Sequence, residues 1–181
     1  MKRAVILFAT ILSSITLGAS AFIVLPKRLI WNTSASAPIG LYAVQPADAL
    51  EVTDLVAVVA PPLIAEFMAD RRYLPFGVPM MKRVLALPGQ VVCRDGLDIF
   101  VHGAVIGRAR ERDKADRKMP SWRGCRRIAD DEIFLMNWDA ADSVDGRYFG
   151  PFARGYVIGR VRPVWTDEAG NGHFEWWADT R

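Results

Sequence analysis

Residues 79–89 read Pro79-Met80-Met81-Lys82-Arg83-Val84-Leu85-Ala86-Leu87-Pro88-Gly89, and this stretch decides the expected fold. Its apolar run ends at a Pro-Gly pair, which predicts a β-strand over Pro79–Leu87. Side chains alternate between the two faces of a strand, so Lys82 shares a face with apolar neighbours. Burial there would lower the pKa of the lysine and make its amine a base. Alternatively, Lys82 lies on an edge strand and extends its amine to water, and the pattern taken alone favours that second interpretation.

Short apolar segments bounded by turn residues occur on both sides of this stretch. Six of them predict further strands: Leu55–Ala60, Val91–Arg94, Leu97–Val101, Glu132–Asn137, Tyr156–Trp165 and His173–Trp177. A helix is predicted from Pro61-Pro62 through Tyr73, because proline is tolerated at the first helical position and apolar residues follow at helical spacing. Short strands with one short helix indicate a mainly β fold rather than alternating βαβ units.

The amino-terminal segment has a different composition from the rest of the chain. Ala4–Leu25 is a run of 22 residues without a charge, flanked by Lys2 and Arg3 on one side and by a second basic pair on the other. The run exceeds the apolar region of a signal peptide and is long enough to span a bilayer. The sequence therefore predicts an uncleaved, single-pass transmembrane helix, with residues 1–28 as the anchor and residues 29–181 as one further domain.

The anchor also explains the overall composition. The chain has 181 residues, 51% of them hydrophobic, with mean hydropathy +0.13 and net charge +3. Without the anchor run the hydrophobic share falls to about 48%, as in an ordinary globular domain. Lys2 and Arg3 account for most of the charge surplus, so we expect no nucleic-acid partner. Arg108–Lys118 has nine charged side chains in eleven positions and predicts a solvated hairpin or loop.

Few groups in the chain can carry catalysis. Two histidines, His102 and His173, lie in predicted surface positions, and neither a phosphate loop nor a dinucleotide fingerprint occurs. We therefore expect no cofactor and no metal. A serine candidate, Ser36, lies in the Ser/Ala-rich stretch of residues 32–42, which is either a linker or, because Pro38 and Gly40 follow, a fixed turn.

Three stretches resemble the conserved boxes of a known family. Ser-Ala-Pro-Ile-Gly-Leu-Tyr at 36–42 is similar to the serine box of bacterial type I signal peptidases, and more closely to that of the TraF-type pilin-maturation peptidases of conjugative transfer. Residues 73–77 with 81–89 resemble the lysine box, and residues 142–151 resemble the third box. The boxes occur in the order of the family and cover most of the chain. The resemblance implies a compact signal-peptidase-like β domain behind the transmembrane helix.

The resemblance also implies a Ser/Lys dyad. Ser36 matches the nucleophile and Lys82 the general base, which must be neutral to accept the hydroxyl proton. Ser34 matches a residue whose hydroxyl assists the backbone amide of the nucleophile in the oxyanion hole, and Thr33 is an alternative for that role.

Three further residues match positions of the family that hold the dyad in place. Ser143 matches a serine that orients the lysine amine, while Asp145 and Arg147 match a structural carboxylate and its arginine partner. Gly146 stands where relatives commonly have serine, and residues 137–139 depart from the general leader-peptidase pattern. These departures favour the conjugative branch.

Cys93 and Cys125 are 32 positions apart. In an oxidising periplasm they could form a disulfide, which in the chain-entropy model adds about 3 to 4 kcal/mol. Two buried free thiols remain the alternative.

The resemblance predicts a membrane-anchored serine endopeptidase of the bacterial inner membrane with its catalytic domain on the periplasmic side. Its expected partners are the lipid of that membrane and a pilin or other leader-bearing precursor, cut to a linear or a cyclic product. Two alternatives stay open: a general signal peptidase that removes secretory leader peptides, and a non-catalytic anchored component of the transfer apparatus.

Overall fold

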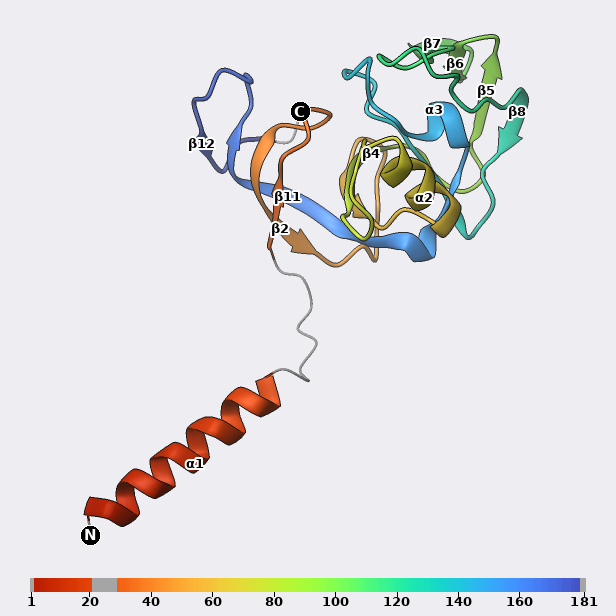
Figure 1. Cartoon of the computed structure of the whole chain (residues 1–181). Coiled ribbons are helices and arrows are strands. Elements are labelled where there is room, and N and C mark those ends of the chain that lie inside the picture. Colours follow the sequence, from red (N-terminus) through yellow and green to blue (C-terminus); the bar gives the residue numbers. More distant parts are fainter. Residues whose placement is uncertain (1, 21–28, 180–181) are drawn as a thin grey trace.

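The computed structural model describes residues 2–20 and 29–179, and β-strands dominate the second of these ranges (Figure 1). The larger sheet has the strand order β1-β2-β11-β3-β4-β9-β10, with β12 paired to β11, and all its pairings are antiparallel. Its strands are β1 (Leu29–Asn32), β2 (Ile39–Gln45), β3 (Leu55–Val58), β4 (Met80–Ala86), β9 (Glu132–Leu135), β10 (Phe152–Ala153), β11 (Val157–Asp167) and β12 (Glu175–Trp176). The mainly β prediction is therefore confirmed.

A second, smaller sheet has the order β7-β6-β5-β8. It consists of β5 (Val91–Asp95), β6 (Asp98–Val101), β7 (Ala104–Arg108) and β8 (Gly124–Arg127). Cys93 on β5 lies directly opposite Cys125 on β8, and the two form a disulfide. The disulfide prediction is confirmed, and the free-thiol alternative is wrong.

Two short helices lie in the strand-rich range. In α2 (Pro62–Asp70), proline occupies the start, as predicted, and Ala65 and Met68 are buried against the core. The helix ends three residues before the predicted Tyr73. A 3-10 turn, η1 (Arg154–Tyr156), leads into β11.

The helix α3 (Gly146–Phe149) was not predicted, and Figure 1 shows it near the smaller sheet. Asp145 caps it by accepting a hydrogen bond from the backbone N–H of Arg147. A Cβ atom at Gly146 would lie 2.7 Å from the carbonyl oxygen of Leu135, closer than such atoms approach. This crowding explains glycine at a position where the family resemblance implied serine.

The first helix, α1 (Lys2–Ser20), holds most of the predicted anchor, and the side chains of residues 3–19 are exposed. Within the described ranges, no helix combines the length and the apolarity needed to cross a membrane. The predicted span, Ala4–Leu25, continues into residues 21–28, which lie outside the described residues. The proposed boundary between anchor and domain lies there too.

Several sequence-based strand assignments need correction. β1, β2, β7, β8 and β10 were not predicted. All four residues of β8 are exposed, so the strand has no alternation of apolar and polar residues in its sequence. Residues 173–177 shorten to the two-residue β12, and the other predicted strands differ from the observed ones by one or two residues at an end. The charged segment 108–118 forms a loop with one isolated bridge, as expected.

The preference for Lys82 at a sheet edge was wrong. β4 is an interior strand, paired with β3 on one side and β9 on the other. Lys82 lies at the β3 pairing, opposite Val56, and is only 4% exposed.

Candidate active site

Ser36 lies in a fixed turn between β1 and β2. The buried side chain of Asn32, at the end of β1, holds this turn from inside. Its Nδ2 donates to the carbonyl oxygens of Ser34, Ala37 and Pro38 at 2.9, 3.0 and 3.0 Å, and its Oδ1 accepts from the backbone N–H of Ser34 at 3.0 Å. The linker alternative is therefore wrong for this turn.

The other end of the turn is fixed from β2. The buried Tyr42 donates its hydroxyl hydrogen to the carbonyl oxygen of Pro38 at 2.7 Å, and burial raises the pKa of this tyrosine well above its usual value. Gly40 has φ +149°, and a Cβ there would lie 2.2 Å from the carbonyl oxygen of Trp165 on β11. Glycine thus lets β2 approach β11 directly behind the turn.

Lys82 of β4 faces this turn from the interior of the sheet. Its Nζ lies 3.4 Å from Ser36 Oγ and 2.7 Å from Ser143 Oγ. Three residues separated by 46 and 61 positions in the sequence therefore meet at one amine. The structure brings together the predicted nucleophile, base and orienting serine.

The surroundings of Lys82 favour its neutral form. Burial lowers the pKa of the amine from 10.5 to about 8, because desolvation disfavours the ammonium ion. The negative charge of Asp145 raises this pKa and the positive charge of Arg147 lowers it, both by less than the effect of burial. A lysine with a pKa near 8 is a usable base at neutral to mildly alkaline pH.

Ser34, rather than Thr33, contacts Ser36. The Ser34 Oγ lies 2.9 Å from the Ser36 Oγ and accepts a hydrogen bond from the Ser36 backbone N–H at 3.3 Å. Thr33 lines the same cleft. Ser34 and the backbone amide of Ser36 therefore form a pair of potential donors beside the Ser36 hydroxyl.

Asp145 and Arg147 form a buried ion pair behind the site. They are 0% and 1% exposed, and the guanidinium donates to both carboxylate oxygens at 2.9 Å. Arg147 also donates to the carbonyl oxygens of Asn137, Ala140 and Ser143 at 3.1, 2.8 and 3.2 Å. The pair thereby fixes the loop that carries Ser143.

Like Asn32, Asn137 is a residue of the site that was not predicted from the sequence. Its Nδ2 donates to the carbonyl oxygen of Ser36 at 2.6 Å and to that of Met81 at 3.1 Å, while its Oδ1 accepts from the backbone N–H of Arg83 at 2.8 Å. Asn137 thus ties the serine turn to β4 on either side of Lys82. The available signal was a single asparagine directly after an apolar strand.

A cleft with a volume of about 330 Å³ is lined by Ser36, Lys82 and Ser143, together with Ser34. Met68, Leu74 and Met80 are among the apolar residues of its walls. The charged loop, residues 108–118, forms another part of the cleft wall. There Arg110 and Lys114 form ion pairs with the carboxylate of Asp142 at 2.9 and 2.6 Å.

Neither histidine is near this cleft. His102 lies in the turn between β6 and β7 with φ +51°, and His173 is exposed near the end of the described range. Over residues 2–20 and 29–179, no group of three or more His, Cys, Asp or Glu residues is arranged to hold a metal ion.

Comparisons with known proteins assign the chain to a family. The family model for signal peptidase, peptidase S26, matches residues 1–166. The plasmid transfer protein TraF of Escherichia coli is 31% identical over 146 residues, which cover 75% of this chain and 81% of that protein. The conjugal transfer protein TraF of Agrobacterium fabrum is 30% identical over 174 residues, which cover 91% of this chain and 97% of that protein.

Among solved structures, the chain is similar to a signal peptidase I from Enterococcus faecalis V583, with 17% identity and a TM-score of 0.38. The match covers 62% of this chain and 97% of that one. By the family model and the TraF relatives, the chain belongs to the signal peptidase S26 family and to its TraF-like branch.

Proposed function

We propose that this protein is a membrane-anchored serine endopeptidase with a Ser36–Lys82 dyad, which processes a pilin precursor in a conjugative transfer system. One observation carries the proposal: a buried amine with a lowered pKa lies between the hydroxyl groups of Ser36 and Ser143. Membership of a peptidase family supports a serine peptidase-like enzyme.

In the proposed first step, the neutral amine of Lys82 accepts the proton of the Ser36 hydroxyl while Ser36 Oγ bonds to the carbonyl carbon of the scissile peptide. The resulting ammonium group returns this proton to the leaving nitrogen, and the C–N bond breaks. Ser143 holds the amine at 2.7 Å through both transfers. The products of this step are a free amine and an acyl ester on Ser36.

The tetrahedral intermediate carries a negatively charged oxygen. We assign the backbone amide of Ser36 and the hydroxyl of Ser34 as its donors, because both lie beside the Ser36 hydroxyl. A donor of this kind is worth about 2.7 to 4 kcal/mol in the transition state.

Water then releases the acyl group and gives a linear product. Attack by the amino terminus of the substrate itself would instead give a cyclic one. The proposed substrate, a pilin precursor, rests on the resemblance to pilin-maturation peptidases and on the similarity to proteins described as plasmid and conjugal transfer proteins.

The proposed location is the periplasmic face of the inner membrane, with a single anchor over Ala4–Leu25. The uncharged run supports the anchor. Exposed aromatic side chains beside β1, the first strand of the domain, support a place close to the bilayer: Trp31 of β1 and Trp176 of β12 are 49% and 66% exposed, and both lie against Trp165 of β11. Such residues are enriched at membrane interfaces.

The proposal is tested by co-expressing the full chain with the pilin precursor and measuring the mass of the product. We expect the parent protein to convert the precursor, and Ser36→Ala and Lys82→Ala to leave it uncut. Ser13→Ala on α1 and Arg126→Ala on β8 are matched controls that should process normally.

Unchanged processing in both dyad variants would contradict the protease function and favour a non-catalytic component of the transfer apparatus. Efficient cleavage of ordinary secretory precursors would instead identify a general signal peptidase. A product lighter by one water than the linear chain would show cyclisation.

A further inference from the structure

A second cavity, with a volume of about 440 Å³, lies on the other side of the charged loop from the catalytic cleft. Five basic residues and one acidic residue line it. These are Arg94, Arg110, Arg112, Lys118 and Arg123, with Glu111 as the acidic member. We refer to this cavity as the basic pocket.

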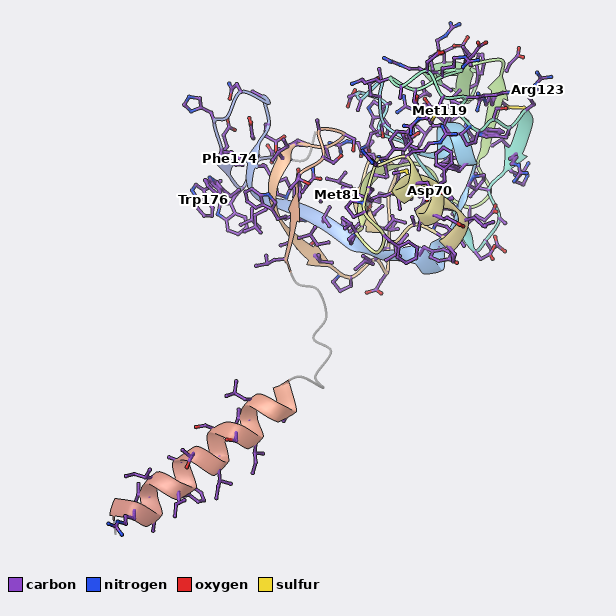
Figure 2. All side chains as sticks on the ribbon, viewed as in Figure 1. Asp70, Met81, Met119, Arg123, Phe174 and Trp176 are labelled. Atoms are coloured by element: carbon purple, nitrogen blue, oxygen red, sulfur yellow. A yellow bond between two sulfur atoms is a disulfide. The ribbon has the colours of Figure 1, made fainter. Side chains whose placement is uncertain are left out.

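The pocket coincides with a covalently closed segment of the chain. All of its lining residues lie between 94 and 123, and the Cys93–Cys125 disulfide closes this segment. Eight basic and five acidic residues lie between the two cysteines, so this segment alone has the net charge of the whole chain, +3. Figure 2 labels Met119 and Arg123 in this part of the molecule, away from Trp176.

Positive charge in the pocket exceeds what neighbouring carboxylates neutralise. Arg110 pairs with Asp142 and Arg112 with Asp116, at 2.9 and 3.5 Å. Lys118 and Arg123 form no ion pair with any residue in the described part of the chain.

The backbone places two of these cations together. Arg112 and Lys118 lie opposite each other in an isolated antiparallel bridge. Like charges placed directly opposite destabilise a pair of strands. An anion bound between them would remove this cost.

Two residues that line the pocket, Arg94 and Trp122, are hydrogen-bonded to the helix that supports the catalytic site. Arg94 is 3% exposed and donates to the carbonyl oxygens of Gly96 and Arg147 at 3.0 and 2.6 Å. Trp122 donates its indole N–H to the carbonyl oxygen of Gly146 at 3.0 Å. Both contacts end on α3, beside the ion pair that holds the Ser143 loop.

The basic pocket also adjoins the cleft. Arg110, Arg112 and Met119 line both, so one loop is the wall between them. The pocket is therefore adjacent to the cleft that contains Ser36.

We propose that the segment closed by the Cys93–Cys125 disulfide is a recognition module, and that its basic pocket binds acidic side chains of a peptide whose scissile bond lies at Ser36. This inference rests on the proposed function in one respect: the peptide is identified as part of the pilin precursor. Carboxylates fit this site because arginine forms paired, charge-assisted hydrogen bonds with them.

The test uses the full chain in detergent micelles and two fluorescent probes, hexaglutamate and hexaglutamine. We expect the parent protein to bind hexaglutamate, more weakly at high salt, and not to bind hexaglutamine. Lys118→Glu/Arg123→Glu reverses two exposed charges in the pocket, and we expect it to weaken hexaglutamate binding about tenfold or more. Arg126→Glu/Arg162→Glu makes the same change of net charge outside the pocket and should bind like the parent.

Equal binding by the pocket variant and the parent would overturn the proposal, as would equal binding of both probes. Displacement of hexaglutamate by an equal concentration of inorganic phosphate, or by vesicles containing phosphatidylglycerol, would assign the site to phosphate groups and overturn it too. Reduction of the disulfide should weaken hexaglutamate binding in the parent.

Precursor cleavage, measured in parallel, separates this inference from the proposed function. We expect the pocket variant to raise KM with little change in kcat, because neither Ser36 nor Lys82 lines the pocket. If the parent binds hexaglutamate but cuts no precursor, the proposed function fails and the acidic-peptide site stands. If the parent cuts the precursor and the pocket variant matches the control in both assays, only this inference fails.

Discussion

At the scale of single residues, the position of Lys82 in the fold determines the chemistry of its amine. Its place on an interior strand removes it from water, and Ser36 and Ser143 surround its amine with hydroxyl groups. The same burial that lowers its pKa also costs stability whenever the amine is charged. Activity and stability therefore depend on pH in related ways.

The rate of precursor cleavage should rise with pH. Only neutral Lys82 accepts the Ser36 proton, and its pKa is about 8. The neutral fraction increases roughly tenfold between pH 7 and pH 9, and kcat/KM should follow it. A pH series of initial rates with the full chain measures this. A flat profile over that range would contradict a lysine base.

Replacing Lys82 by methionine should stabilise the protein while abolishing activity. The folded pKa lies below the unfolded value of 10.5, so the unfolded chain binds the additional proton between pH 8 and 10.5 and stability rises with pH across that window. Below pH 8 the folded protein bears the full free-energy cost of burying the charged amine. Lys82→Met removes this cost and should raise the free energy of unfolding by up to about 3 kcal/mol. Denaturant unfolding at pH 7 and pH 11 should show the gain at pH 7 and little at pH 11. A loss of stability at pH 7 would refute this account of the amine.

At the scale of elements, α3 and the loop before it decide where Ser143 lies. The Asp145–Arg147 pair fixes both, since one carboxylate caps α3 and one guanidinium binds three loop carbonyls. Because the pair is fully buried, loss of one partner leaves an uncompensated charge.

Asp145→Asn should therefore lower the free energy of unfolding by about 3 to 5 kcal/mol. The exposed pair of Asp98 with Arg108, at 3.4 Å, supplies the control, and Asp98→Asn should cost less than about 1 kcal/mol. Chemical denaturation of both variants compares the two costs. Similar losses in both would show that burial of the Asp145 pair has no special role.

Sequence patterns predicted strands that contain apolar runs and missed short strands and the exposed β8. The interior strand β4 was clear from its apolar run, whereas the fully exposed β8 was not. The family resemblance predicted that Ser36, Lys82 and Ser143 belong to one site. It did not predict the roles of Asn32 and Asn137. Their roles depend on backbone carbonyls that come together only in the folded chain. Burial of Lys82 likewise depends on its two neighbouring strands, which a local pattern does not reveal.

At the scale of the whole molecule, the two sheets have different roles. The larger sheet supplies Ser36 and Lys82, and the smaller sheet carries the disulfide and one wall of the basic pocket. A hydrophobic cluster joins them, with Ala86 of β4, Val92 of β5 and Phe134 of β9 among its buried members. The smaller sheet is thereby attached to the catalytic strands.

Removal of the disulfide should loosen the smaller sheet first. In the chain-entropy model, Cys93→Ala/Cys125→Ala should cost about 3 to 4 kcal/mol. Because the bond joins β5 to β8, amide hydrogen exchange should increase most in these two strands. Unchanged exchange there, with unchanged unfolding, would show that the bond contributes nothing to the fold.

The central claim is that Ser36 forms a covalent acyl-enzyme with the help of Lys82. The most direct measurement is an acid quench of the full chain during turnover of the pilin precursor, followed by peptide mapping by mass spectrometry. The account predicts an acyl ester on the peptide containing Ser36 in the parent protein, and neither ester nor cleavage in Ser36→Ala. Continued cleavage by Ser36→Ala, or an acyl group on another residue, would contradict it.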